Sequence, residues 1–131
     1  MLTGNGADYM RGLQSVHLMA SIRIPPDRFA HRIPGPDGER STLVYEHGTL
    51  TVKLYAPRDI DHQQPHTRDE VYFVVSGYGT FIHGDRHDPF EPDDFLFATA
   101  GVPHRFENFS DDLLLWVLYY GPEGGEKPRG T

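Results

Sequence analysis

The sequence contains no cysteine and no long hydrophobic run. The absence of cysteine excludes disulfides, thiolate zinc sites, iron–sulfur clusters and a cysteine nucleophile. The longest apolar run, residues 113–118, is far shorter than the roughly 20 residues that cross a bilayer. The first residues also lack the basic and apolar regions of a signal peptide. We therefore expect a cytoplasmic protein without a membrane partner.

Positive charge is also scarce. The chain has 12 Lys and Arg residues against 19 Asp and Glu residues, which gives a formal net charge of −7. Because such a chain is repelled by a phosphate backbone, nucleic acid is not an expected partner. Its 131 residues, 37% hydrophobic and 24% charged, have the length and composition of one globular domain.

Short extended segments follow one another through the middle of the chain, with Gly, Pro and Asp between them. This pattern is typical of an all-β sandwich or barrel, and no long helical periods alternate with the segments as an α/β fold requires. The charged residues 85–88 are expected to form a connection. The expected strands are 42–46, 50–55, 70–76, 80–83, 95–99, 104–109 and 113–120.

The remaining segments define three regions. Residues 1–40 are expected to form an N-terminal extension that packs on the barrel, irregular in its proline-rich part from residue 25. Apolar residues spaced three apart predict one short helix within residues 8–20. Residues 41–121 form the barrel, and the glycine-rich residues 122–131 are expected to be a flexible tail.

Two of the expected strands, 70–75 and 113–118, are apolar on both faces. A strand that is apolar on both faces needs cover on both sides. The second sheet of a sandwich can cover one face, and the N-terminal segment or a second subunit the other. We therefore predict a homodimer.

The chain has eight histidines, and most of them need no special explanation. They fall in the expected helix, in the proline-rich segment, in turns or at a strand end, where a histidine is usually an ordinary surface or structural residue. These are His17, His31, His47, His83 and His87.

His66, Glu70 and His104 differ because of the strands on which they fall. His66 and Glu70 are four residues apart, so both point to one face of an extended chain, together with Tyr72. A carboxylate inside a barrel is costly unless it is paired or binds a cation. His104 begins another alternating strand. Two imidazoles and a carboxylate suit a divalent first-row metal; pairing of Glu70 with an arginine is the alternative.

The spacing of these residues resembles two motifs of the cupin superfamily. The first cupin motif reads G-x5-H-x-H-x3,4-E-x6-G, and the chain matches it from His66 through Glu70 to Gly77. The second motif reads G-x5-P-x-G-x2-H-x3-N, and the chain matches it at its later positions, which are Gly101, His104 and Asn108. This resemblance implies a double-stranded β-helix, or jelly-roll barrel, which holds one metal ion.

The chain departs from the motifs at several positions. Gln64 stands where the first motif has its first histidine, and His62 lies two residues before it. Gln64 can ligate a metal through its amide oxygen, or His62 can reach the metal through a rearranged loop. We favour Gln64 because it occupies the family's position. Asp93 and Thr99 replace a glycine and a proline of the second motif that are not ligands.

The resemblance implies a metal site formed by Gln64, His66, Glu70 and His104. The metal is one divalent transition ion (Fe, Mn, Ni, Co or Zn). The function expected is that of a small-molecule enzyme, either a dioxygenase or an isomerase or lyase acting on a hydroxy, keto or sugar-like substrate. In such an enzyme His62 is the candidate general base and Tyr72 a candidate acid. The alternative is a metal-dependent module that binds a small ligand without catalysis.

Overall fold

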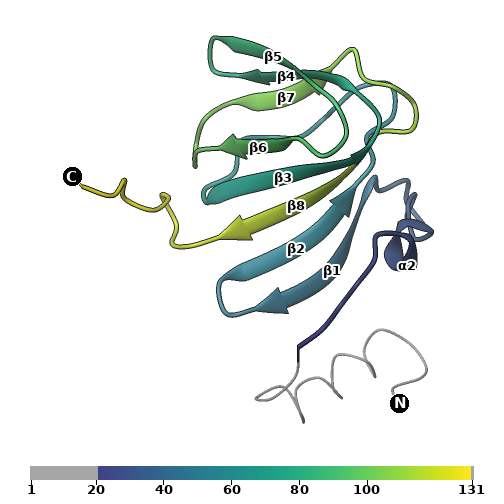
Figure 1. Ribbon diagram of the computed structural model, residues 1–131, viewed down its shortest axis with the longest axis horizontal. Helices are drawn as coiled ribbons and strands as arrows, with labels where there is room; N and C mark the ends of the chain where they lie inside the picture. The colour runs from purple at the N-terminus through teal and green to yellow at the C-terminus, as the bar shows by residue number, and fades with distance from the viewer. Residues whose placement is uncertain (1–20, 131) are drawn as a thin grey trace.

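The computed structural model describes residues 21–130, whose regular structure consists of two antiparallel sheets and one short helix (Figure 1). The larger sheet has the strand order β1-β2-β8-β3-β6, and the smaller sheet has the order β5-β4-β7. This arrangement confirms the predicted all-β barrel. The strands are β1 (Ser41–His47), β2 (Leu50–Tyr55), β3 (Asp69–Ser76), β4 (Gly79–His83), β5 (Arg86–Phe90), β6 (Phe95–Ala98), β7 (His104–Glu107) and β8 (Leu114–Tyr120).

One strand, β5, falls where the sequence predicted a connection. It carries three polar or charged residues and Pro89, which do not resemble a core strand. Because β5 is an edge strand paired only with β4, its outward side tolerates polar residues and a proline. Its buried last residue, Phe90, attaches it to the core.

A short helix, α2 (Asp27–Ala30), interrupts the proline-rich segment that was expected to be irregular. It begins directly after Pro26, and a proline is well tolerated at a helix start because its missing N–H would have no partner there. The helix predicted within residues 8–20 lies outside the described residues. No helix between residues 21 and 130 is long and apolar enough to cross a membrane.

The main core lies between the two sheets and consists largely of aromatic and branched aliphatic side chains. The prediction for β3 is confirmed: Glu70 and Tyr72 are buried, whereas Phe73, which has the opposite parity, is 42% exposed. Side chains from the smaller sheet pack against this face, with the Tyr72 and Phe106 rings 5.0 Å apart and edge to face. The buried members of this core are Tyr72, Val74, Phe81, Phe90, Ala98, Phe106, Leu113, Leu115 and Val117.

Two residues of the cupin-like motifs allow backbone conformations with a positive φ angle. Gly77 has a φ of 87°, and a Cβ there would lie 2.6 Å from the Leu113 Cα. Asn108 has a φ of 51°, a conformation that asparagine adopts more readily than most residues. Because this conformation ends the extended chain, β7 stops at Glu107 and does not reach residue 109 as predicted.

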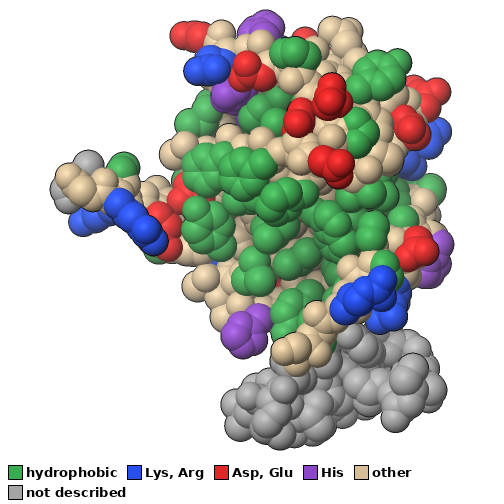
Figure 2. Space-filling model, in the orientation of Figure 1, with side chains coloured by type: hydrophobic (Ala, Val, Ile, Leu, Met, Phe, Trp, Pro, Cys, Tyr) green, Lys and Arg blue, Asp and Glu red, His purple; other side chains and the backbone are tan. Residues whose placement is uncertain are grey.

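Residues 21–130 cover only part of the outer face of the larger sheet. Phe29 of α2 packs with Val44 and Leu54 in a second buried cluster, to which Trp116 also contributes. Residues 24–33 thus cover β1, β2 and part of β8. The apolar side chains of β3 and β6 continue this face without such cover from residues 21–130, and Figure 2 shows hydrophobic side chains gathered across the sheet.

The exposed part of this face contains three phenylalanines from two adjacent strands. Phe73, Phe95 and Phe97 are 42%, 59% and 38% exposed, and the Phe73 and Phe95 rings lie 5.5 Å apart. Exposed apolar patches of this kind are uncommon on monomers and common at interfaces. The homodimer stays a prediction, and this phenylalanine patch is the surface that we expect it to use.

We predict that light scattering at micromolar concentration will give twice the chain mass of 14.9 kDa. Phe95→Glu should lower the mass to that of one chain, because a two-fold interface places the introduced charge in the contact twice. Tyr78→Glu is the matched control, since Tyr78 is 62% exposed but lies outside the phenylalanine patch. A wild-type protein that is purely monomeric would contradict the prediction.

Candidate metal centre

Three side chains from distant parts of the sequence meet between the two sheets. Glu70 is the second residue of β3, His104 is the first residue of β7, and His66 lies in the loop before β3. One potential ligand atom from each lies within 4.8 Å of the others. The structure therefore brings together the three residues that the strand pattern predicted to share a site.

The carboxylate of Glu70 lacks a full set of partners. Its Oε1 atom lies 2.8 Å from His104 Nε2 and 3.9 Å from His66 Nε2. Its Oε2 atom is buried and has no hydrogen-bond partner among residues 21–130. An unsatisfied buried polar atom costs about 1–3 kcal/mol, and more when it is charged. A divalent cation held by this carboxylate and the two imidazoles would remove that cost, so the donor set fits a metal.

The ring of His104 is oriented by its other nitrogen. His104 Nδ1 lies 2.8 Å from the carbonyl oxygen of Val102. A carbonyl oxygen only accepts hydrogen bonds, so Nδ1 carries a proton and Nε2 faces Glu70. A hydrogen bond of this kind fixes the tautomer and the ring orientation of a metal-binding histidine.

The same contacts determine the protonation of His104. Burial lowers its pKa, but the hydrogen bonds to Glu70 and to the Val102 carbonyl outweigh burial and raise the pKa above the ordinary 6.5. When both ring nitrogens are protonated, Nε2 donates to Glu70. A proton on His104 Nε2 therefore competes with a metal ion for one lone pair.

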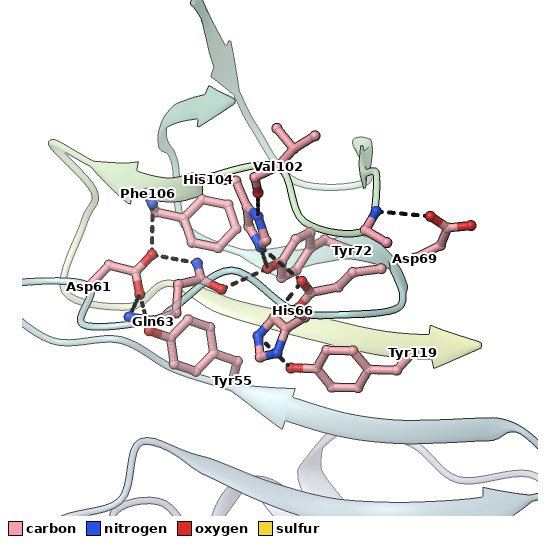
Figure 3. Close-up of polar contacts among 12 residues, drawn as sticks. Tyr55, Asp61, Gln63, His66, Asp69, Tyr72, Val102, His104, Phe106 and Tyr119 are labelled. Carbon is pink, nitrogen blue, oxygen red and sulfur yellow. Dashed lines mark hydrogen bonds and ion pairs between the residues drawn. The ribbon is translucent and has the colours of Figure 1, made fainter. Parts of the chain in front are cut away.

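Tyr72 lies beside this pair and is completely buried (Figure 3). Its hydroxyl donates to Gln63 Oε1 at 2.8 Å and lies 3.0 Å from His104 Nε2. Burial, followed by the charge of Glu70, raises the pKa of Tyr72 well above 10.0. Tyr72 therefore keeps its proton at neutral pH and can serve as a donor but not as a base.

Tyr119 contacts the other histidine. It pairs with Glu70 across β8 and β3, and its hydroxyl lies 3.2 Å from His66 Nε2. Burial and the charge of Glu70 raise its pKa, so it too remains a neutral phenol. The sequence analysis did not select Tyr119, because β8 appeared to be apolar on both faces.

Asp61 is a second residue that the sequence analysis missed. Its carboxylate is 8% exposed and accepts hydrogen bonds from the backbone N–H of Phe106 at 2.7 Å and from Gln63 Nε2 at 2.6 Å. It also accepts one from the Tyr55 hydroxyl. These bonds tie the loop that leads to His66 onto β7. No spacing in the sequence distinguishes this aspartate from its neighbour Asp59.

Asp69 similarly connects segments that are far apart in the sequence. Its Oδ1 atom accepts from the backbone N–H of Ala100 at 3.0 Å, and its Oδ2 atom accepts from that of Glu126 at 2.8 Å. The Gly124 N–H donates to the Thr67 carbonyl at 2.7 Å. Within the predicted flexible tail, Gly124 and Glu126 therefore hydrogen-bond to the barrel next to the His66 loop.

The two motif segments are also joined directly. The backbone N–H of Gly101 donates to the carbonyl of His66 at 2.7 Å. Gly101 has a φ of 79°, which favours glycine at this position. This bond holds the loop of His66 beside the segment that leads into His104.

A cavity of about 180 Å³ is lined by two of the three residues, His66 and Glu70. Ligand pockets commonly measure about 300–1,000 Å³, so this cavity suits a small molecule. Its lining includes Tyr55, Gln63, Gln64, His66, Glu70 and Tyr119.

The other predicted residues lie in different environments. Gln64 is exposed on its outer side and lines the cavity. His62 is exposed and is not among the residues that line it. Asn108 lines a separate cavity on another part of the surface. Among the remaining histidines, His31, His47 and His87 are exposed. His83 binds Asp88 at 2.7 Å, and His17 lies outside the described residues.

The Cupin domain family model matches residues 51–120, more than half of the chain, so the protein belongs to the cupin family. An uncharacterized protein of Streptomyces coelicolor is 38% identical over 76 residues, which cover 56% of this chain and 72% of that protein.

Solved structures share the fold. TT1209 from Thermus thermophilus has a TM-score of 0.59 and 25% identity, covering 75% of this chain and 95% of that one. A Cupin 2 conserved barrel domain protein from Salinispora arenicola has a TM-score of 0.59 and 16% identity, covering 78% and 90%. The likeness to the second protein concerns the fold alone.

We predict that pH affects the metal-free and metal-loaded proteins in opposite ways. The pKa of His104 is raised in the folded state, so its ion pair with Glu70 stabilises the metal-free protein fully below the ordinary pKa of 6.5. That contribution is lost as the pH rises through the raised pKa. Metal binding needs neutral imidazoles, so the stabilisation by metal should increase over the same range.

Urea unfolding between about pH 6 and pH 8.5, with and without a divalent metal, measures both trends. His87→Ala should leave them unchanged, because His87 is exposed on the edge strand β5 and is not one of the site residues. Equal pH dependence with and without metal would contradict the prediction.

Proposed function

We propose that this cupin holds one divalent transition metal through His66, Glu70 and His104 and uses it to act on a small hydroxy, keto or sugar-like compound. The observation that carries the proposal is the buried Glu70 Oε2 atom, which lacks a hydrogen-bond partner in the described part of the chain and belongs to a group that also holds two imidazoles. Structural ion pairs normally satisfy every buried oxygen.

Gln64 is proposed as the fourth ligand. It occupies the position of a family histidine and lines the cavity, whereas His62 does not line it. Its amide oxygen is a neutral donor, as an imidazole is, so the charge of the ligand set is unchanged by the replacement. The mixed nitrogen and oxygen set suits Fe, Mn, Ni, Co or Zn.

A bound metal with an open position can activate dioxygen or polarise a carbonyl group. The residues of the chain would contribute hydrogen bonding and proton transfer. The Tyr72 hydroxyl donates its proton to Gln63 and lies beside His104, and the Tyr119 hydroxyl lies beside His66. Either phenol can donate to an oxygen atom of the substrate, Tyr72 by turning its proton away from Gln63. His62, which is exposed and does not line the cavity, stays the candidate base. Either a dioxygenase or an isomerase or lyase is consistent with these groups.

We predict close to one transition metal per chain in the untagged, purified protein, measured by elemental analysis. His66→Ala and His104→Ala should each lose most of the metal and the thermal stabilisation that it gives, because an ion that binds only the folded state stabilises it. Gln64→Ala should weaken binding, and His62→Ala should retain full metal content. No metal after supplementation of the wild-type protein would contradict the proposed site.

We predict metal-dependent turnover of a small oxygen-containing substrate. Oxygen consumption with catechol, diketone and thiol panels tests the dioxygenase, and NMR of hydroxy and keto compounds tests isomerisation or elimination. Tyr72→Phe should lower kcat while leaving metal content intact, since it removes a proton donor but not a ligand. Tight binding of a compound that is never converted would instead favour the alternative, a ligand-binding module.

A further inference from the structure

The cavity beside the metal centre contains a positive charge that no carboxylate of residues 21–130 pairs with. Lys53 lies in the middle of β2 and lines this cavity. Its register partner on β8 is the buried core residue Val117, so Lys53 projects from the same face of the sheet that forms the core. Among residues 21–130 it has no acidic partner, and its ammonium group lies over the ring of Tyr119.

The ammonium group of Lys53 lies near the metal centre. Its Nζ atom is 5.9 Å from the centroid of the Tyr119 ring, and that ring is 4.8 Å from the ring of His66, centroid to centroid. The Tyr119 ring thus lies between the ammonium group of Lys53 and the imidazole of His66. A small molecule that contacts both Lys53 and the metal ligands fits within these distances.

A second cation lies next to Lys53. A neighbouring cavity of about 280 Å³ shares Lys53, His66 and Tyr119 with the first and is also lined by Arg68. The guanidinium of Arg68 donates to neutral oxygens, which are the carbonyl of Thr49 at 2.5 Å and the hydroxyl of Thr51 at 3.4 Å. No carboxylate within the described residues pairs with it, so its charge also remains at the opening.

These charges contrast with the rest of the chain, whose formal net charge is −7. Within the described part of the chain, Glu70 is the one carboxylate that lines either cavity, and it belongs to the metal centre. Two cations without acidic partners at the opening of a cavity in an acidic protein attract an anion from solution. Their placement therefore favours a negatively charged ligand over a neutral one.

We propose that the ligand of this site is a small hydroxy or keto acid whose carboxylate binds Lys53. This inference rests on the proposed metal function and adds the charge of the substrate to it. The hydroxyl or keto oxygen of the acid faces the metal ligands, while its carboxylate lies against the ammonium group. Arg68 draws the acid toward the cavity, and its contacts with Thr49 and Thr51 keep its side chain at the opening.

The test uses the full chain reconstituted with Co(II), whose absorption spectrum reports a change at the metal. Glycolate, lactate and pyruvate are titrated, each beside its neutral amide. At least one acid should bind about tenfold more tightly than its amide, as expected for a partly buried charge-assisted contact. Lys53→Met should abolish this preference and retain the metal, because methionine keeps the apolar part of the side chain that lines the cavity.

Two controls make the result specific. Lys127→Met removes the only other lysine of the chain, which is exposed, and should leave the preference for the acid unchanged. Lys53→Arg should restore most of the preference, because the positive charge is retained.

Failure of this inference is distinguishable from failure of the metal site. If Lys53→Met keeps both the metal and the preference for the acid, or if no acid binds better than its amide, the inference is overturned while the metal site stands. Binding of inorganic phosphate in place of all three acids would also overturn it. A wild-type protein that does not bind cobalt would instead overturn the proposed function.

Discussion

The negative charge of Glu70 between two sheets is the constraint on which the site depends. Glu70 is buried on the face of β3 that also carries the core residues Tyr72 and Val74, so removing this carboxylate from water costs several kcal/mol. His104 approaches from the opposite sheet and His66 from the preceding loop, and both face Glu70. Contacts with Val102 and Tyr119 orient the two imidazoles. The cost of the buried charge is thus offset by groups that the fold itself holds in position.

Two further carboxylates organise the irregular segments around this charge. Asp61 and Asp69 accept hydrogen bonds from backbone N–H groups that strand pairing leaves without a partner. Each joins parts of the chain that are more than 30 residues apart. The loops that carry or precede the histidines are therefore held in one conformation, as a site with fixed ligand geometry requires.

Much of the fold could be predicted from the sequence because alternation reports burial directly. The strand pattern correctly gave the inward face of β3, and the motif spacing correctly brought His66, Glu70 and His104 together. Alternation could not identify β5, since an edge strand need not be apolar. It could not identify Asp61 or Tyr119 either, because their roles depend on partners across the sheets. A local pattern does not contain those partners.

The hydrogen bonds of Gly124 and Glu126 attach residues beyond β8 to the folded barrel. The family model stops at residue 120, the last residue of β8. A domain cut at that residue would remove the donors to the Thr67 carbonyl and to Asp69 Oδ2, while Asp69 Oδ1 would keep its bond from Ala100. Both acceptors lie within three residues after His66. The unit that shapes the site is therefore longer than the unit that defines the family, and the additional residues belong to its architecture.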